Sequence, residues 1–279
     1  MMGLPVSVCI PVKNEEVNLA ACLAALAEFD EVVVVDSGSK DATVRLAREA
    51  GATVLQFEWN GKFPKKRNWA LQNHRFKHPW ILFLDADERM NPSFVAELKD
   101  TLRNTTHVGF WITFNNWFMG VPLRHGDVFH KLSLFKVGAG EYERFEEDSW
   151  CHLDMEVHEH PVLDGTTGEM KVRLEHQDYR GLKHYLSRHN EYSSWEANRY
   201  LWLQSAGEDE WKNLTGRQRF KYQCLGRWWL AWLYWGISLW AMRGFLDGRL
   251  GFRFAELKRR YFQEIRLKIM EAKRTGKPA

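Results

Sequence analysis

The sequence predicts an α/β protein with a Rossmann-like, mostly parallel sheet and a helical, Trp-rich C-terminal extension. Two observations predict the sheet: short apolar runs alternate with helical patterns over the first hundred residues, and the apolar runs end in polar residues. Alternating elements of this kind build a parallel sheet with right-handed crossovers, and ligands bind at the carboxyl ends of its strands. A third observation predicts the extension: most of the 14 tryptophans lie in the second half of the chain.

The first 117 residues contain the alternating elements. Val6 to Ile10 is a strand pattern closed by Pro11, and Asn14, Glu15 and Glu16 cap the helix that follows. In chain order, the further strands expected here are 31–35, 51–57, 80–84 and 108–117, with helices starting near residues 42, 68 and 92.

The alternation stops after residue 117. Residues 118–180 combine short strand candidates, 131–137 and 171–175, with Gly-rich turns, and we interpret them as an acceptor-side part of the first domain, 1–180. Residues 181–279 form a separate helical extension: a helix over 181–204, then two helices between 217 and 270 that are broken near Gly248 and Gly251.

The composition sets limits on partners and compartment. A net charge of +3 with 27% charged residues gives no reason to expect nucleic acid as a partner. The four cysteines show no C-x-x-C spacing, which is typical of reduced cytosolic thiols. The first residues enter a strand at once and have no secretory signal pattern, so we expect a cytoplasmic protein.

The strongest candidate site follows the strand Trp80 to Leu84, which ends in the acids Asp85, Asp87 and Glu88. Carboxylates at alternate positions past a strand end can converge on one hard cation, which leaves positions for substrate phosphate. The alternative is a solvated loop with an acidic cap. We expect Asp87 to reach the cation, Asp85 to meet a ribose or a water of the cation, and Glu88 only to begin the next turn.

Four polar segments follow the expected strands in order. They are 11–15, 36–43, 65–68 and 85–87. Together they resemble family 2 glycosyltransferases of the GT-A fold, in which a nucleotide-diphospho-sugar binds across the first strands and an Asp-x-Asp motif holds a metal ion. The resemblance covers the first half of the chain clearly and the rest more loosely.

The resemblance implies a set of residues that bind the nucleotide-sugar donor. They are Pro11, Asn14, Glu15, Asp36, Ser37, Arg67 and Asp85. The carboxylate of Asp36 can accept from a base or a ribose, or it can cap the next helix, and Glu15 can instead favour a helical turn. Lys65, Lys66 and Arg67 stand at a helix start, where cations oppose the dipole, so we expect a bound diphosphate there. Arg67 is the expected contact, with Lys65 and Lys66 as surface charges.

The resemblance also implies a divalent cation, Mg²⁺ or Mn²⁺, held by Asp87 and Asp85. Members of the family often carry a histidine after a later strand that completes the metal shell, and His176 stands there. A satisfied structural histidine is the alternative. The loop Arg124–Asp127 is a candidate for gripping the acceptor or the pyrophosphate.

The reaction implied is an inverting displacement, in which one carboxylate removes the proton of the acceptor hydroxyl. Residues 154–160 concentrate the candidates. If they form a strand, Asp154, Glu156 and His158 share one face and Glu159 lies on the other. The run Val157 to Glu159 resembles that of bacterial lipopolysaccharide-core members, which favours Glu159 as the base and Glu156 next. A plain surface position is the alternative for either acid.

The extension contains fifteen residues without charge, Trp228–Met242, bracketed by Arg227 and Arg243. A bilayer-spanning helix needs about 20. Trp and basic flanks favour a helix that lies in the membrane interface, and an ordinary buried helix is the alternative. Residues 244–252 resemble the tail of the lipopolysaccharide-core glucosyltransferase branch, whose acceptors are lipid-anchored.

We therefore expect an inverting, metal-dependent hexosyltransferase. The resemblance implies a nucleotide-sugar donor linked to UDP and a lipid-linked glycan acceptor at the inner face of the cytoplasmic membrane. One alternative is a catalytically silent nucleotide-sugar sensor or scaffold on the same fold. Another is a nucleotidyltransferase, which would release pyrophosphate, but no Gly-rich phosphate loop lies near Pro11 to favour it.

Overall fold

The computed structural model describes residues 4–126, 128–144, 147, 150–151, 153–156, 159–212 and 214–279. Asp127, Val157 and His158, singled out above, lie outside this set. The chain forms two compact units. The first comprises residues 1–122, 128–148 and 152–180, and the second comprises 123–127, 149–151 and 181–279.

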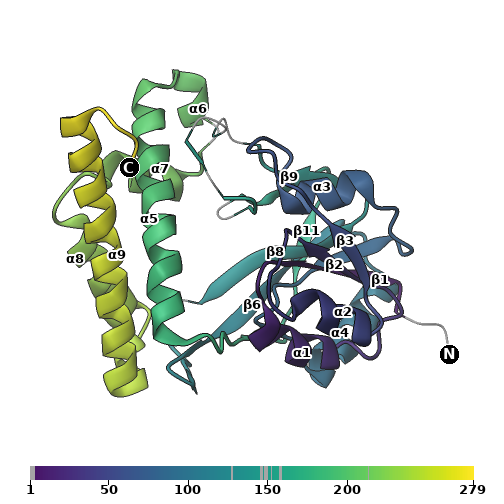
Figure 1. Ribbon diagram of the computed structural model, residues 1–279. Helices are drawn as coiled ribbons and strands as arrows, with labels where there is room; N and C mark the ends of the chain where they lie inside the picture. Colours follow the sequence, from purple (N-terminus) through teal and green to yellow (C-terminus); the bar gives the residue numbers. More distant parts are fainter. Residues whose placement is uncertain are drawn as a thin grey trace. The chain divides into compact units, whose positions relative to one another are not determined.

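The first unit is built on one large sheet with the strand order β3-β2-β1-β4-β8-β6-β12-β5 (Figure 1). Its strands are β1 (Val6–Val12), β2 (Val32–Asp36), β3 (Thr53–Gln56), β4 (Trp80–Phe83), β5 (Glu88–Arg89), β6 (Gly109–Phe118), β8 (Phe129–Lys136) and β12 (Leu174–His176). Strands β7 (Val121–Pro122) and β11 (Thr167–Glu169) pair with β6, and β9 (Gly140–Tyr142) pairs with β10 (Pro161–Leu163). Strands β1 to β4 run parallel, which confirms the predicted sheet, whereas β8 is antiparallel to both β4 and β6.

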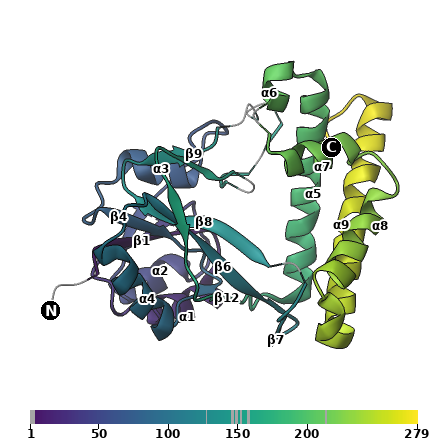
Figure 2. The ribbon, with the colours of Figure 1, turned by 180° about the vertical axis from the view of Figure 1, so that it is seen from behind.

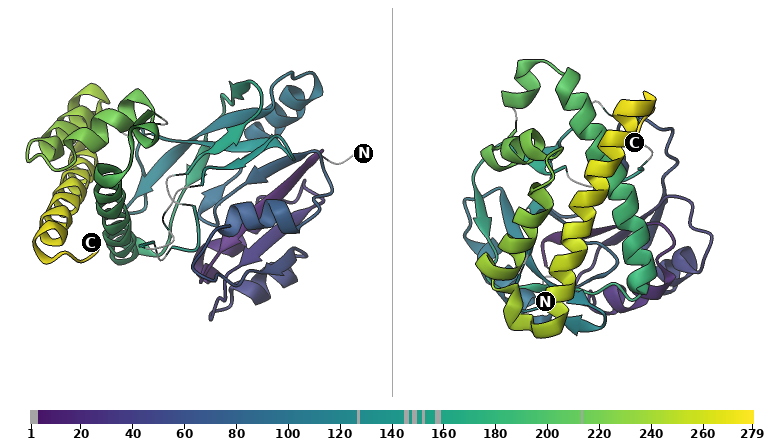
Figure 3. Two further views of the ribbon diagram at one scale, coloured as in Figure 1. Left: turned by 90° about the horizontal axis from the view of Figure 1, so that it is seen from above. Right: turned by 90° about the vertical axis from the view of Figure 1, so that its left-hand side faces the viewer.

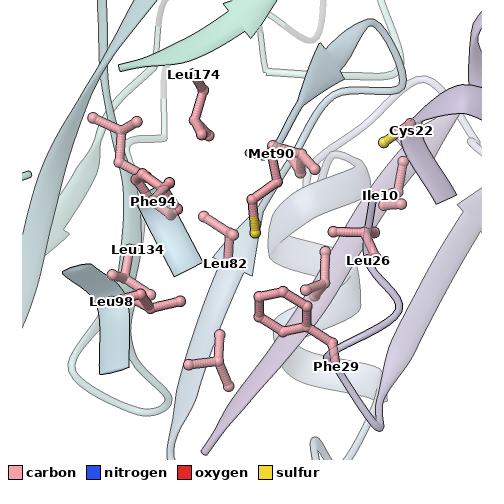
Figure 4. Close-up of a cluster of buried hydrophobic side chains, with 14 of the residues drawn as sticks. Ile10, Cys22, Leu26, Phe29, Leu82, Met90, Phe94, Leu98, Leu134 and Leu174 are labelled. Atoms are coloured by element: carbon pink, nitrogen blue, oxygen red, sulfur yellow. The ribbon is translucent and has the colours of Figure 1, made fainter. Parts of the chain in front are cut away.

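Helices follow the parallel strands as predicted. They are α1 (Glu16–Ala24), α2 (Thr43–Glu49), α3 (Lys66–Asn73) and α4 (Pro92–Arg103). Side chains alternate across β1: Val8 and Ile10 join the core that α1 and α4 complete, whereas Cys9 joins the core on the other face, with Ala70 of α3. Figure 4 shows the first of these cores, in which Phe94 of α4 lies near the strand residues. Because both faces are covered, β1 and β4 are buried along their whole length.

Strand β1 continues past Pro11, so the expected end of the strand there is wrong. The carbonyl of Cys9 accepts from Leu84 on the β4 side, and that of Val12 accepts from Ser37 on the β2 side. Pro11 therefore faces the β4 side, where the pairing with β4 has already ended at Cys9. A proline there costs no ladder hydrogen bond, because no partner strand needs its missing N–H.

The start of α1 is capped from outside its own sequence. Its N-cap residue Glu15 makes no side-chain cap, and the backbone N–H of Glu16 donates to Asp41 at 3.2 Å. The carboxylate of Glu16 in turn accepts from the N–H of Ala42 at 2.9 Å. The predicted cap by Asn14 is therefore wrong, and the loops after β1 and β2 hold each other at the carboxyl edge of the sheet.

The second unit is helical. Its elements are α5 (Gly181–Ser205), α6 (Glu208–Lys212), α7 (Gly216–Cys224), α8 (Leu230–Gly236), a π-helix (Ile237–Ala241), a 3₁₀-helix (Gly244–Asp247) and α9 (Gly248–Thr275). Helix α9 lies beside both α5 and α8 (Figures 2 and 3). Among the described helices, none has both the length and the apolar character needed to cross a membrane.

The expected break at Gly251 is wrong, because α9 runs through it. A Cβ atom at Gly251 would lie 1.9 Å from the carbonyl oxygen of Gly244. Glycine is therefore present because the preceding 3₁₀-helix packs directly on the backbone of α9. The uncharged run 228–242 is also divided, into α8 and the π-helix, and ends before Arg243, whose φ is 60°.

Candidate active site

Asp85 follows β4 at the same edge of the sheet as the ends of β1 and β2, and it lies between two cations. Its Oδ1 accepts from Nη2 of Arg67 at 2.7 Å, and its Oδ2 pairs with Nζ of Lys131 on β8. Lys131 also lies 2.6 Å from a carboxylate oxygen of Glu88. The carboxylate of Asp85 is thus oriented by one cation from α3 and one from the antiparallel strand.

Glu88 is fully buried in β5, so the expectation that it only begins a turn is wrong. Its second oxygen accepts from the backbone N–H of Asp85 at 2.9 Å, which closes the acidic loop. Burial raises the pKa of Glu88 to about 7, against the lowering effect of Lys131.

Asp87 faces a histidine and an arginine from the segment that follows β11. Its Oδ2 lies 3.5 Å from Nε2 of His176 and 3.5 Å from Nη2 of Arg180. The other ring nitrogen of His176 lies 3.2 Å from the side-chain oxygen of Asn116. Burial disfavours the charged ring of His176, but the carboxylates of Asp87 and Glu88 together outweigh burial and raise the pKa. The structure thus brings Asp87 and His176 together from distant parts of the sequence.

A hydrogen-bonded cluster connects Asp87 to the start of α1. Arg180 donates to Glu15 at 2.5 Å and to both carboxylate oxygens of Asp178 at 2.8 Å. The side-chain amide of Asn18 then bridges Glu15, at 3.1 Å, and Asp178, at 3.0 Å. Arg180 therefore connects Glu15 to Asp87, and Asn18 and Asp178 hold Glu15 and Arg180 in place.

Asp36 ends β2 and organises the loop after it. Its carboxylate accepts from the backbone N–H groups of Gly38 and Ser39, each at 3.1 Å to Oδ2, and Gly38 adopts the left-handed φ of 77° that this turn requires. Asn14 also has a positive φ, 55°, and its N–H donates to the hydroxyl of Ser39 at 2.8 Å. Ser37 is half-buried beside the end of β1, and Pro11 is buried within it. The N–H and the hydroxyl of Ser39 also donate to Oδ1, so the loop after β2 engages both carboxylate oxygens of Asp36.

The three cations at the start of α3 are all buried, so the expectation of surface charges at Lys65 and Lys66 is wrong. Lys65 pairs with Glu147 and with Glu159, and Nζ of Lys66 lies 3.0 Å from the carbonyl oxygen of Val12. Carboxylates of Asp154 and Asp85 neutralise Lys66 and Arg67 respectively. Burial lowers the pKa of Lys66, although Asp154 opposes this. The anions that these cations need are supplied by the protein itself.

The two acids expected as the base have structural partners. The carboxylate of Glu156 accepts from the backbone N–H groups of Arg67 and Asn68, each at 3.1 Å, and thereby caps α3. Burial raises its pKa. Glu159 lies 2.9 Å from Nζ of Lys65, and its side chain is 1% exposed. The described parts of 153–160 contain no strand, so the expected alternation of faces does not apply to them.

Lys131, Asn18, Asp178 and Arg180 were not singled out from the sequence. Lys131 lies in a strand pattern, where a lysine is expected to face solvent. The sequence therefore does not indicate that Lys131 contacts Asp85. Asp178 and Arg180 follow His176 within four residues, and this cluster of charge after a strand end was a usable signal.

The description "Glycosyl transferase family 2" belongs to the family model that matches residues 7–148, which is just over half of the chain. The chain belongs to glycosyltransferase family 2. It is an α/β glycosyltransferase.

The similar proteins match this chain over different shares of its length. The lipopolysaccharide core biosynthesis glycosyltransferase LpsC of Rhizobium meliloti is 28% identical over 71% of this chain and 72% of its own. A TPR repeat-containing protein of Synechococcus elongatus is 37% identical over 38% of this chain, which spans only 26% of that relative. Glucosyl-3-phosphoglycerate synthase of Mycobacterium tuberculosis, solved with Mn²⁺, UDP and glucosyl-3-phosphoglycerate, is 24% identical over 41% of this chain and 44% of its own, with a TM-score of 0.28. A TM-score of 0.28 is too low for that structure to indicate the fold of this chain.

The donor atoms near the acidic loop fit a divalent cation. Asp87 offers a carboxylate oxygen, the ligand type that suits Mn²⁺ or Mg²⁺, and His176 offers a ring nitrogen that faces it, a ligand type that suits softer metal ions better. Within the described ranges, no group of three or more His, Cys, Asp or Glu side chains is arranged to hold a metal ion. A cation held by Asp87 and His176 would keep open positions, as cations that bind substrate phosphates do.

Proposed function

We propose that this glycosyltransferase is inverting and metal-dependent, and that it transfers a hexose from a UDP-sugar to a lipid-anchored glycan. One observation carries the proposal: Asp36, Asp85 and Asp87 stand at one carboxyl edge of a parallel sheet, where α/β proteins bind their ligands. The lipopolysaccharide-core function of LpsC supports an acceptor in lipopolysaccharide or another cell-envelope polysaccharide.

In this proposal Asp87 and His176 hold Mg²⁺ or Mn²⁺, which when bound would neutralise the diphosphate leaving group. Asp85, oriented by Arg67 and Lys131, accepts from the donor ribose or from a water of the cation. Lys131 and Arg67 also supply positive charge beside the place where negative charge develops on the diphosphate.

The remaining donor contacts come from the loops after β1 and β2. We assign them to Pro11, Asn14, Glu15, Asp36 and Ser37. Hydrogen bonds of Asn14 with Ser39 and Lys40 hold the two loops together, so the nucleoside would bind to preformed loops at little ordering cost.

Glu159 is the proposed base, with Glu156 second. Each has a buried structural partner, and Glu156 caps α3, so Glu159 is the better placed of the two to change its partner. In the reaction, the carboxylate takes the proton of the acceptor hydroxyl while the oxygen forms its bond to the sugar carbon and the bond to the diphosphate breaks.

A screen of nucleotide sugars with Mn²⁺, read out as released nucleoside diphosphate, tests the proposal. We expect UDP release from one UDP-hexose, increased by a lipid-anchored glycan extract. Donor binding without UDP release would indicate a silent nucleotide-sugar binder, and release of pyrophosphate would indicate a nucleotidyltransferase. Either result would contradict the proposed reaction.

We further propose that the protein works as a peripheral protein on the inner face of the cytoplasmic membrane, because that is where a lipid-linked acceptor would be presented to it. The tryptophans and arginines of the second unit support this location.

A further inference from the structure

The second unit carries an unusual concentration of exposed apolar side chains. Of the 20 large hydrophobic side chains that are exposed in the described part of the chain, half lie between residues 220 and 270. They include Trp228, Trp232 and Trp240, which are 67%, 50% and 61% exposed. Folding normally buries tryptophan, so three exposed ones in one region indicate a binding surface.

Ring contacts connect these side chains across neighbouring helices. The ring centroids of Trp232 and Trp235, both on α8, lie 6.1 Å apart. The centroids of Trp235 and of Phe252 on α9 lie 5.8 Å apart. Trp240 of the π-helix packs against Phe245 of the 3₁₀-helix at 5.4 Å. We call the surface made by Trp232, Trp240, Phe245 and Phe252, together with Arg249 and Arg253, the aromatic face.

The charges around the aromatic face are almost all positive. Residues 227–260 contain seven basic side chains and two acidic ones. Asp247 accepts from the N–H of His125 at 2.8 Å, and Glu256 pairs with Arg259 at 2.6 Å, so both acids are engaged within the unit. Arg249 lies one helical turn before Phe252, and Arg253 directly follows it.

Arg227, Arg243, Arg249 and Arg253 are all exposed, and none has a carboxylate partner among the described residues. A symmetric contact between two copies of the chain would bring these arginines against one another, because a two-fold interface joins the same patch on both partners. The charge therefore disfavours a second copy and favours a negatively charged occupant.

We propose that the aromatic face docks on the surface of an anionic lipid bilayer, with its tryptophans at the headgroup level and Arg249 and Arg253 against the lipid phosphates. Tryptophan prefers the headgroup level and arginine binds phosphate oxygens, so one lipid surface satisfies both kinds of side chain. This deepens the membrane location proposed above by assigning the residues that make it.

The test is sedimentation of the full chain with vesicles of phosphatidylcholine and phosphatidylglycerol, and with phosphatidylcholine alone, at low and high salt. We expect binding to the anionic vesicles that weakens with salt. Each basic residue near an anionic surface contributes about fivefold in affinity, so Arg249→Glu with Arg253→Glu should weaken binding by at least about 25-fold. The matched control, Arg45→Glu with Arg103→Glu, changes net charge equally at exposed sites in the first unit and should weaken binding much less.

A second pair, Trp232→Ser with Trp240→Ser, should reduce both vesicle binding and the quenching of tryptophan fluorescence by brominated lipid. Circular dichroism verifies that each variant folds. The proposal is wrong if the wild type stays in solution at low salt, or if both arginine pairs weaken binding equally. A dimer that the tryptophan variant abolishes, without vesicle binding, would instead make a second copy the occupant. Because no sugar transfer is measured, these outcomes are independent of the proposed reaction.

Discussion

Replacing Lys131 by methionine should destabilise the first unit measurably, because this lysine is the cation shared by Asp85 and Glu88. Removing one member of a buried ion pair costs about 3–5 kcal/mol, since the other charge stays buried without its partner. Glu88 is fully buried, but the Lys131 side chain is 21% exposed and Arg67 still pairs with Asp85. We therefore expect the low end, a loss of about 3 kcal/mol in the free energy of unfolding.

Urea unfolding followed by circular dichroism measures this loss, with Lys136→Met as the matched control. Lys136 ends the same strand and lies over the ring of Trp80, 5.4 Å from its centroid, so its replacement should cost no more than about 1 kcal/mol. Adding Glu88→Gln to Lys131→Met should restore part of the stability, with a coupling of at least about 1 kcal/mol. A loss below about 1 kcal/mol, with no coupling to Glu88, would refute the role assigned to Lys131.

Three further predictions concern other parts of the chain. Glu159→Gln should lower kcat at least about 100-fold with little change in the KM for the donor, and an unchanged kcat would exclude Glu159 as the base. Burial raises the pKa of Glu156, so the folded state binds a proton at this carboxyl more tightly than the unfolded state does. The stability that this proton contributes is complete below the ordinary pKa of a glutamate and is lost as the pH rises through the raised pKa. Glu156→Gln should remove this part of the pH dependence of the free energy of unfolding. Gly251→Ala should lower stability by about 1–3 kcal/mol, because its Cβ would meet the carbonyl of Gly244, and a higher Tm in the variant would contradict that contact.

The order of strands and helices in the first unit was predictable because local rules determine it. Strand Trp80 to Phe83 is apolar and ends at Asp85, and an apolar strand between helical patterns places its carboxyl end at the ligand edge of the sheet. The positions of Asp36, Asp85 and Asp87 at one edge follow from parallel pairing alone.

The partners of these acids were not predictable, because tertiary packing selects them. Lys131 reaches Asp85 from an antiparallel strand inserted beside β4, and Arg180 reaches Asp87 from almost a hundred residues away. Lys65 and Lys66 have the composition of surface charges, and only the carboxylates of 147–159 make their burial possible.

The break expected at Gly251 was also misplaced, and for a similar reason. Gly251 has the local signature of a helix break, yet it serves a close approach between two segments, which a one-residue pattern does not distinguish.

The most direct test of the proposed reaction is UDP release by Asp87→Asn in the presence of Mn²⁺, with the UDP-hexose that the wild type turns over. Asparagine preserves the shape of the side chain and removes its charge, and Asp100→Asn on the surface of α4 is the matched control. We predict that Asp87→Asn keeps its circular dichroism spectrum and loses UDP release by at least about 100-fold, while Asp100→Asn retains it. Equal UDP release by the wild type and Asp87→Asn would contradict a metal-dependent transfer at this site.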